Sequence, residues 1–304
     1  MDRITELSGK IEELVESYFH EPELRRLAKE FIAYKATESG VFGKLASLHC
    51  EMFGGSARQA EYAAAAAETM ILALDIYDDL QDLDNDAVPW SQVPAALSLN
   101  VAIALQALSI EAVCRGAEGD DGRAMLAMRL LNHGILKAVN GQHTDLRNEW
   151  ATEEECLQMI ADKSGALVAA VCLAGTALAT GKYNESVAAY GQALGVAAQL
   201  RNDIAGVERW DKRNDLLYRK RTLPLFYVLE EPGEKADMLR AYYDGALSRD
   251  DVLLHKQELM EFVQECGCIE YAQVHARIKE YEIEKVLAQM ELEEHWKEQI
   301  RQYM

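Results

Sequence analysis

The sequence predicts an all-α protein, folded as a helical bundle around a deep central cavity. Apolar residues recur at spacings of three and four along most of the 304 residues, which is the period of an amphipathic helix. We find no clear alternation of apolar and polar residues, the pattern that would indicate strands. Only 5 residues are proline, so few positions interrupt a helix.

Composition and charge narrow the classes of function. Apolar residues make up 49% of the chain, enough for a full hydrophobic core. The formal net charge is −20, from 51 acidic and 31 basic residues. Nucleic-acid binding needs clustered basic residues, so this balance argues against a nucleic-acid partner. Without internal repeats or a linker, we expect a single domain over residues 1–304.

The first third of the chain predicts three helices. Residues 4–18 and 23–35 carry apolar residues at helical spacing. Ser56 follows a glycine-rich turn and is a suitable N-cap for a longer helix. That helix contains an alanine run and continues into an aspartate-rich stretch, before residues 87–90 break it.

The remaining chain predicts further helices. Residues 94–115 carry so few charges that we expect a central helix covered on all sides. A mobile or ligand-ordered loop is expected at 209–221, where charged residues dominate. Two or three charged amphipathic helices are expected after Pro232. The other helices are expected at residues 123–145, 153–178 and 186–208, and the last helix at 271–303.

The cysteines and apolar runs predict a cytoplasmic location. Residues 1–6 are polar, unlike a secretory signal, so the six cysteines are expected to be reduced, buried thiols. No uninterrupted apolar run reaches the ~18 residues of a transmembrane helix, so no transmembrane segment is expected. The longest run, residues 166–180, is expected to form a buried core helix. The pair Cys266 and Cys268 lacks the second pair that a zinc site needs.

The aspartate-rich stretch is the first candidate for chemistry. Six aspartates fall within residues 75–86. On a helix, Asp78 and Asp82 lie one turn apart on the same face, where like charges repel. Asp75 and Asp79 form a second such pair. A hard divalent cation with oxygen ligands would relieve this repulsion.

Four further polar clusters follow, and each has a purely structural alternative. Residues 141–146 could be a solvated helix end, and Lys163 could extend to the surface rather than bind a buried anion. Residues 199–206 end an apolar helix with amide and carboxylate oxygens. Residues 215–224 bring three consecutive cations before a proline, which suits an anion such as phosphate but also suits a solvated surface.

In order and spacing these clusters resemble the motifs of the class I all-α isoprenoid synthases, the trans-prenyltransferases. That family carries the motifs DDxxD, GQxxDL, K-[ST]-[GA], QxxDDxxD and DLxxGKxTLP. The corresponding segments here are residues 78–82, 141–146, 163–165, 199–206 and 215–224. The resemblance covers roughly residues 30 to 230 and implies the isoprenoid-synthase fold.

The resemblance also implies a mechanism, in which an allylic diphosphate ionises to a carbocation and magnesium neutralises the leaving diphosphate. The implied metal ligands are Asp78, Asp79, Asp82, Asn202 and Asp203, for two or three ions with the third left open. The implied catalytic residues are Asp78, Asp82, Lys163 and Gln199. The implied substrate-binding residues are Gln142, Asp145, Lys163, Gln199, Lys220 and Arg221, with Arg219 as an alternative to Arg221.

Departures from the family motifs bear on the acceptor. Chain-elongating members hold isopentenyl diphosphate with a GKRxRP segment and an Arg-Arg pair. This chain has Lys44 in a weak match to the first, and residues 84–86 contain two aspartates and an asparagine where the arginines would stand. The second aspartate motif has Asn202 and Gly206 in place of aspartates.

Within the family, residues 78–85, 141–145 and 179–185 resemble segments of the ComQ-type prenyltransferases of Gram-positive quorum sensing. This likeness implies transfer of a geranyl- or farnesyl-class group to a tryptophan of a small pheromone precursor peptide, by a homodimer. The alternatives are a prenyl diphosphate synthase or class I terpene cyclase, and a non-catalytic binding protein on the same fold.

Overall fold

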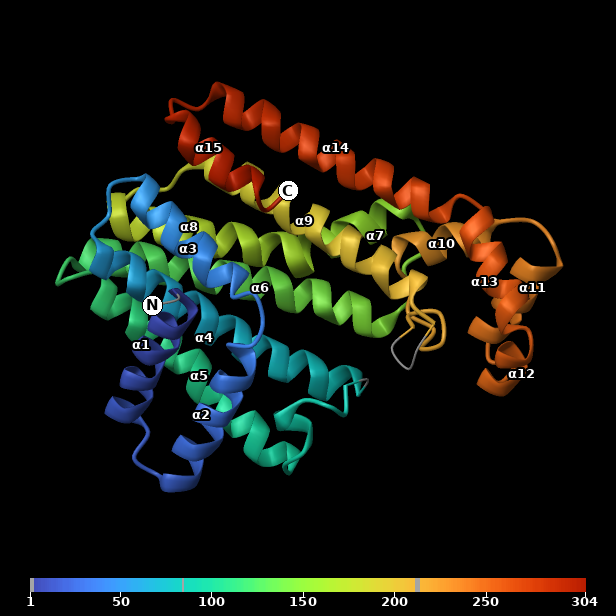
Figure 1. Ribbon diagram of the computed structural model, residues 1–304, viewed down its shortest axis with the longest axis horizontal. Helices are drawn as coiled ribbons and strands as arrows, with labels where there is room; N and C mark the ends of the chain where they lie inside the picture. The colour runs from blue at the N-terminus through green and yellow to red at the C-terminus, as the bar shows by residue number, and fades with distance from the viewer. Residues whose placement is uncertain (1–2, 84, 211–213) are drawn as a thin grey trace. The chain divides into compact units, whose positions relative to one another are not determined.

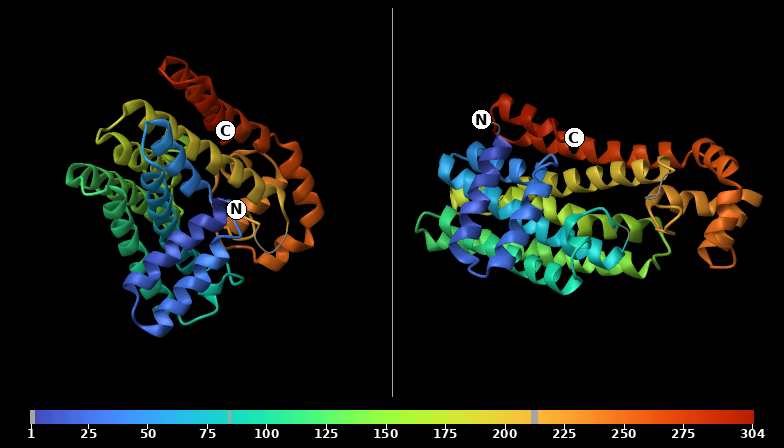
Figure 2. Two further views of the ribbon diagram at one scale, coloured as in Figure 1. Left: turned by 60° about the vertical axis from the view of Figure 1, so that its left-hand side comes forward. Right: turned by 60° about the horizontal axis from the view of Figure 1, so that its bottom comes forward.

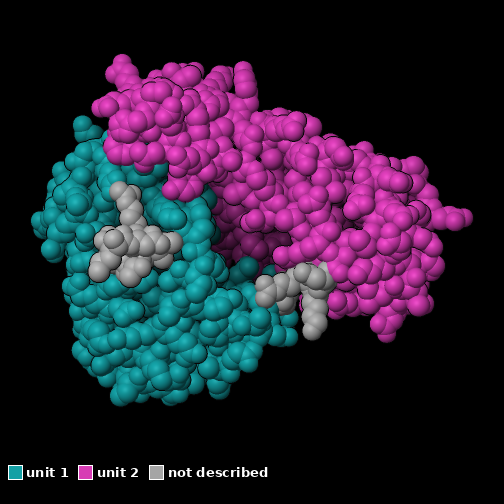
Figure 3. Space-filling view, in the orientation of Figure 1, with its two compact units in different colours: residues 1–137, 166–191 teal, residues 138–165, 192–304 magenta. Residues whose placement is uncertain are grey.

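The computed structural model describes residues 3–83, 85–210 and 214–304, and within them every regular element is helical (Figures 1 and 2). The all-α prediction is confirmed. The chain divides into two compact units, coloured separately in Figure 3. Unit 1 comprises residues 1–137 and 166–191, and unit 2 comprises residues 138–165 and 192–304. The expectation of one domain over 1–304 stays a prediction.

Unit 1 is organised around α4 (Ala57–Asp82), which packs against α3, α5 and α8. Ser56 caps α4 as predicted, in a capping box with Gln59. Residues 63–67 are buried alanines, whose small side chains allow neighbouring helices to approach closely. The other elements of unit 1 are α1 (Arg3–Tyr18), α2 (Pro22–Lys35), α3 (Val41–Met52), the 3-10 turn Pro89–Ser91, α5 (Ala95–Gly116), residues 121–137 of α6 (Asp121–Arg147), α8 (Ala166–Thr180) and the first turns of α9 (Glu185–Glu208).

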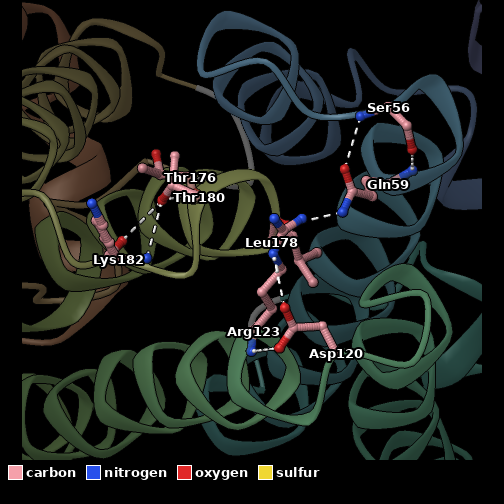
Figure 4. Close-up of polar contacts among 8 residues, drawn as sticks. All are labelled: Ser56, Gln59, Asp120, Arg123, Thr176, Leu178, Thr180 and Lys182. Carbon is pink, nitrogen blue, oxygen red and sulfur yellow. Dashed lines mark hydrogen bonds and ion pairs between the residues drawn. The ribbon is translucent and has the colours of Figure 1, made fainter.

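One backbone carbonyl joins three helices at one end of unit 1 (Figure 4). The Gln59 amide from α4 donates to the carbonyl oxygen of Leu178 at 3.0 Å. The Arg123 guanidinium from α6 donates to the same oxygen at 3.2 Å, and Asp120 pairs with Arg123. Leu178 lies in the last turn of α8, where the carbonyl lacks a helical partner, so these contacts satisfy it.

Two helical stretches, Ala95–Gly116 and Glu153–Thr180, are long and apolar enough to cross a membrane by length and composition. Core helices of globular proteins meet the same criterion. The second stretch contains α8, which is buried as predicted from Ala166 to Ala179 except for Leu167. The prediction that the first would be covered on all sides is wrong for the single chain, because Ile103 is 59% exposed and Ile110 is 51% exposed.

Unit 2 has two apolar clusters. One places Leu200 and Ile204 of α9 against Ile160 of α7 and Ala276 of α14. The other gathers around Leu225, with residues of α11 to α13. The elements of unit 2 are residues 138–147 of α6, α7 (Glu153–Ile160), the π-helical turn Ala161–Gly165, residues 192–208 of α9, α10 (Leu223–Glu230), α11 (Glu234–Tyr243), α12 (Arg249–Leu254), α13 (Lys256–Glu265), α14 (Cys268–Gln289) and α15 (Glu294–Arg301).

Several element predictions need correction. The helix α3 was not expected, and the expected helix over 153–178 is interrupted by the π-helical turn. Five helices rather than two or three follow Pro232, and the helix expected over 271–303 ends at Gln289 before α15 begins. The six cysteines are free thiols. The expectation that they are buried is wrong for Cys114, which is exposed, and for Cys266, which is half-buried.

Candidate active site

The first aspartate motif ends α4. Asp78 and Asp82 lie one turn apart in its last turns, and both are half-buried. Leu83 then adopts φ 54°, a left-handed conformation that stops the helix. The motif therefore sits at a helix end, with two carboxylates on one face as the spacing predicted. Asp84 lies outside the described residues.

Two further aspartates of this stretch, Asp79 and Asp75, have protein partners. Asp79 accepts hydrogen bonds on its two oxygens from Asn85 Nδ2 at 3.0 Å and Trp90 Nε1 at 2.7 Å. Asp75 forms an ion pair with Lys35 at 2.7 Å, and burial raises its pKa to about 6. These contacts join the end of α4 to the following loop and to α2.

In unit 2, three segments bring predicted residues together. Lys163 Nζ of the π-helical turn lies 2.6 Å from the Asp145 carboxylate of α6. Ser164 donates to Gln199 Oε1 of α9 at 2.7 Å. Gln199 Nε2 in turn donates to Asp203 at 2.8 Å. The predicted residues Asp145, Lys163, Gln199 and Asp203 therefore meet in unit 2 through direct contacts.

A π-helical turn carries the Lys163 motif. Single π turns inside helices are frequent at functional sites, because they redirect side chains. The turn also lies against α6 at Gly141, where an added Cβ would come within 2.4 Å of the Lys163 backbone nitrogen. Glycine at the start of the GQxxDL segment is thus required by close backbone approach.

Asp203 is a buried carboxyl group in acidic surroundings. Its exposure is only 5%. Burial raises the pKa of Asp203 to about 7, the Gln199 hydrogen bond opposes this rise, and Asp215 and Asp145 add to it. Lys163 is the cation that acts in the opposite direction. Because the neighbouring charge is mainly negative, a bound cation would stabilise the ionised form of Asp203.

Asp215 is a residue to which the sequence assigned no role. An added Cβ at Gly206 would lie 2.1 Å from an oxygen of Asp215, so the Asp215 carboxylate occupies the space beside that glycine. Gly206 stands where the second motif normally has its last aspartate. The Asp215 carboxylate thus reaches the vacated position from the following loop. Its coupling to Asp203 was not visible in the sequence spacing.

Hydrogen bonds within unit 2 hold both ends of the segment 214–221 before α10, and residues 211–213 lie outside the described residues. Buried Asn214 donates to the carbonyls of Val207 and Arg209 and accepts from the backbone of Leu217. Arg221 binds the Asn148 side chain through its backbone nitrogen at 2.9 Å. Lys220 is half-buried beside it.

The remaining predicted residues differ in exposure and role. Gln142 is half-buried on α6, while Asn202 is exposed on α9. Arg219, the alternative to Arg221, lies over the Tyr242 ring at 4.3 Å and donates to a carbonyl, so its guanidinium is engaged within unit 2. Asp78, Asp79 and Asp82 belong to unit 1, and the other predicted site residues belong to unit 2.

Comparisons with known proteins identify the family of this chain. The polyprenyl synthetase family model matches residues 41–260. Tryptophan prenyltransferase ComQ of Bacillus subtilis (strain 168) is 30% identical over 96% of this chain and 95% of its own length. The Bacillus spizizenii protein of that name is 31% identical over 75% of this chain and 80% of its own length. Geranylgeranyl pyrophosphate synthetase from Geoglobus acetivorans shares the fold, with a TM-score of 0.78 at 22% identity, covering 97% of this chain and 92% of that one. This chain belongs to the polyprenyl synthetase family.

Proposed function

We propose that this chain transfers a prenyl group from an allylic diphosphate to a tryptophan side chain of a small peptide. The observation that carries the proposal is the 30% identity with tryptophan prenyltransferase ComQ over nearly the whole of both chains. The donor would be of the geranyl or farnesyl class, and the peptide a quorum-sensing pheromone precursor.

The reaction breaks the bond between the allylic carbon and the diphosphate oxygen, and the electron pair leaves with the diphosphate. The π electrons of the indole ring then bond to the allylic carbon, and the ring loses a proton. Lys163 and Lys220 would neutralise charge on the leaving group, with Arg221 nearby in sequence. Gln199 would keep Asp203 in position through their 2.8 Å hydrogen bond.

The acidic residues suit magnesium, which prefers oxygen ligands and often binds through one or two carboxylates together with substrate phosphates. Bound magnesium would neutralise charge on the departing diphosphate. Asp78 and Asp82 of α4, and Asp203 with Asn202 of α9, would supply protein oxygens. Among the described residues no three acidic, histidine or cysteine side chains form a ready-made cluster, so substrate oxygens would complete the coordination.

A peptide acceptor explains the missing cations. Isopentenyl diphosphate would need basic residues after the first aspartate motif, but Asn85 there binds the Asp79 carboxylate instead. An indole carries no charge and needs no such receptor. Without added cations a second diphosphate would meet carboxylates, which is unfavourable.

We further propose one domain over 1–304, because the family model spans residues of both units. A cytoplasmic location fits the six free thiols. A homodimer fits the exposed apolar face of α5, where Ile103 and Ile110 lie seven residues apart on one side.

The test is a transfer assay with purified protein, magnesium, farnesyl or geranyl diphosphate, and a peptide with one tryptophan encoded beside the gene. We expect a mass gain of one prenyl unit on the peptide, and none on the matched peptide with phenylalanine at that position. A parallel reaction supplies isopentenyl diphosphate instead of peptide. Lipid products longer than the donor, without peptide modification, would instead establish a prenyl diphosphate synthase, and cyclised products a terpene cyclase.

A further inference from the structure

Unit 1 contains a cavity of about 630 Å³ between α1, α2, α3 and α4. Its volume lies in the range of pockets that hold small molecules or peptide side chains. Along α4 its wall follows one face of the helix, where Ala57, Ala60 and Ala64 leave space that larger side chains would fill. Leu72 marks the end of the cavity nearest the first aspartate motif along α4.

Glu68 and Lys44 are two of the polar residues that line this cavity. Glu68 of α4 lines it and is 7% exposed, and its Oε1 accepts a 2.6 Å hydrogen bond from the Gly43 backbone. An added Cβ at Gly43 would come within 2.8 Å of the Glu68 side chain, so the glycine permits this contact. Lys44, one residue further along α3, also lines the cavity and is exposed.

The charges that line the cavity argue against an anionic ligand. Of its three lysines, Lys10 pairs with Glu13 at 3.1 Å and Lys35 pairs with Asp75 at 2.7 Å. Four glutamates also line it. A diphosphate would therefore meet mainly carboxylates. A prenyl chain would leave Glu68 and Lys44 facing a purely apolar ligand, which costs free energy for each polar group left without a partner.

A peptide segment with an apolar side chain would complement both the apolar and the polar residues that line the cavity. Its side chains would contact the alanines and Leu72, and its backbone amides would exchange hydrogen bonds with Glu68 and Lys44. We infer that this cavity of unit 1 binds the acceptor peptide, with the reacting indole at its Leu72 end. The inference rests on the proposed function and specifies where its second substrate binds.

The position along α4 is consistent with this role. Leu72 precedes Asp78 by six residues, which corresponds to about 9 Å along the helix axis. An extended peptide advances about 3.3 Å per residue, so a short segment spans that distance. A peptide held by Glu68 and Lys44 could therefore present a tryptophan at the level of the first aspartate motif.

Two substitutions test the cavity through the Michaelis constant for the peptide. Ala64→Phe fills it, and Lys44→Met removes a cation of the cavity wall at an exposed position where folding is not at risk. Their matched controls are Ala189→Phe, at an exposed alanine of α9, and Lys182→Met, at an exposed lysine. We expect the peptide KM to rise about tenfold for Ala64→Phe and about threefold for Lys44→Met, with the controls within about twofold.

Hydrolysis of the prenyl diphosphate by water is measured in the same variants without peptide. We expect it to stay within about twofold of the unsubstituted protein, because the cavity is assigned to the acceptor alone. An equal loss of hydrolysis and transfer in Lys44→Met would overturn the assignment. So would an unchanged peptide KM in both cavity variants.

A photo-crosslinking experiment separates this inference from the proposed function. The probe is the same peptide with benzoylphenylalanine next to the tryptophan, and the labelled residues are mapped by mass spectrometry. Labels on α1 to α4 within the cavity support the inference, whether or not the prenyl group is transferred. Efficient transfer with labels only outside these helices would support the proposed function but refute the inference that the peptide binds in the cavity. Failure of transfer with cavity labels would refute the function alone.

Discussion

Asp215 places a carboxylate beside Gly206, at the position where the family motif has its last aspartate. Its carboxylate fills the space beside Gly206. Burial is the main cause of the raised pKa of Asp203, and the negative charge of Asp215 raises that pKa further. We predict that Asp215→Asn weakens metal binding about tenfold, as loss of a group next to a metal ligand commonly does. The measurement is Mn²⁺ binding by electron paramagnetic resonance, in the presence of a non-reactive prenyl thiolodiphosphate.

The control for this prediction is Asp244→Asn, which alters an exposed aspartate of the same unit. Its Mn²⁺ affinity is expected to match that of the unsubstituted protein. Equal affinities for both variants would show that Asp215 does not contribute to the metal site.

Glu68 is expected to make stability depend on pH. Burial raises its pKa, and the Gly43 hydrogen bond opposes that rise only in part. Because the folded-state pKa lies above the unfolded value of about 4.3, its protonated form stabilises the fold in acid, and this contribution is lost as pH rises through the folded-state pKa. Glu68→Gln stays neutral at every pH.

We therefore predict that the difference in Tm between Glu68→Gln and the unsubstituted protein becomes more positive from about pH 4 to about pH 8. Thermal unfolding followed by circular dichroism measures it. Glu61→Gln, at an exposed glutamate of the same helix, is the matched control and should show no such trend. A constant or decreasing difference for Glu68→Gln would contradict the prediction.

At the scale of elements, the π-helical turn and α6 depend on their close contact. Gly141→Ala would place a methyl group 2.4 Å from the Lys163 backbone nitrogen, so the two segments must separate. We predict a loss of stability of about 1–3 kcal/mol, in the range of overpacked cores. We also predict weaker binding of the prenyl diphosphate, because Lys163 moves away from its 2.6 Å contact with Asp145.

Denaturant unfolding and binding of prenyl thiolodiphosphate measure the two effects. The control is Gly9→Ala on α1, where an added Cβ has no neighbour within 4 Å. There alanine should stabilise the helix by about 0.5–1 kcal/mol. A neutral effect of Gly141→Ala on both measurements would show that the turn tolerates displacement.

Elements with a strong local pattern were predictable from the sequence, whereas contacts between elements were not. The N-cap Ser56 and the buried run of α8 follow from capping chemistry and apolar composition, and the structure confirms both. The π-helical turn leaves the apolar spacing almost unchanged, so a continuous helix was expected there. Asp215 reaches Gly206 through the fold of a loop, which spacing along the chain does not encode.

At the scale of the whole molecule, the exposed side of α5 is the main departure from a self-sufficient fold. The sequence led us to expect a covered helix, and composition alone could not reveal that the single chain leaves part of it open. Leu99, Ile103 and Ile110 are each more than 40% exposed and lie on one side of the helix. Contiguous exposed apolar side chains of this kind usually mark a protein interface.

We propose that a second copy of the chain covers this side of α5 in a homodimer. We expect Ile103→Glu to convert the dimer to a monomer, because burying an unpaired carboxylate in an apolar interface is unfavourable. Sedimentation velocity measures the change. Val274→Glu introduces the same charge at an exposed apolar residue of α14 and should leave the dimer intact. A monomer before any substitution, or dissociation by both variants alike, would show that this face of α5 is not the interface.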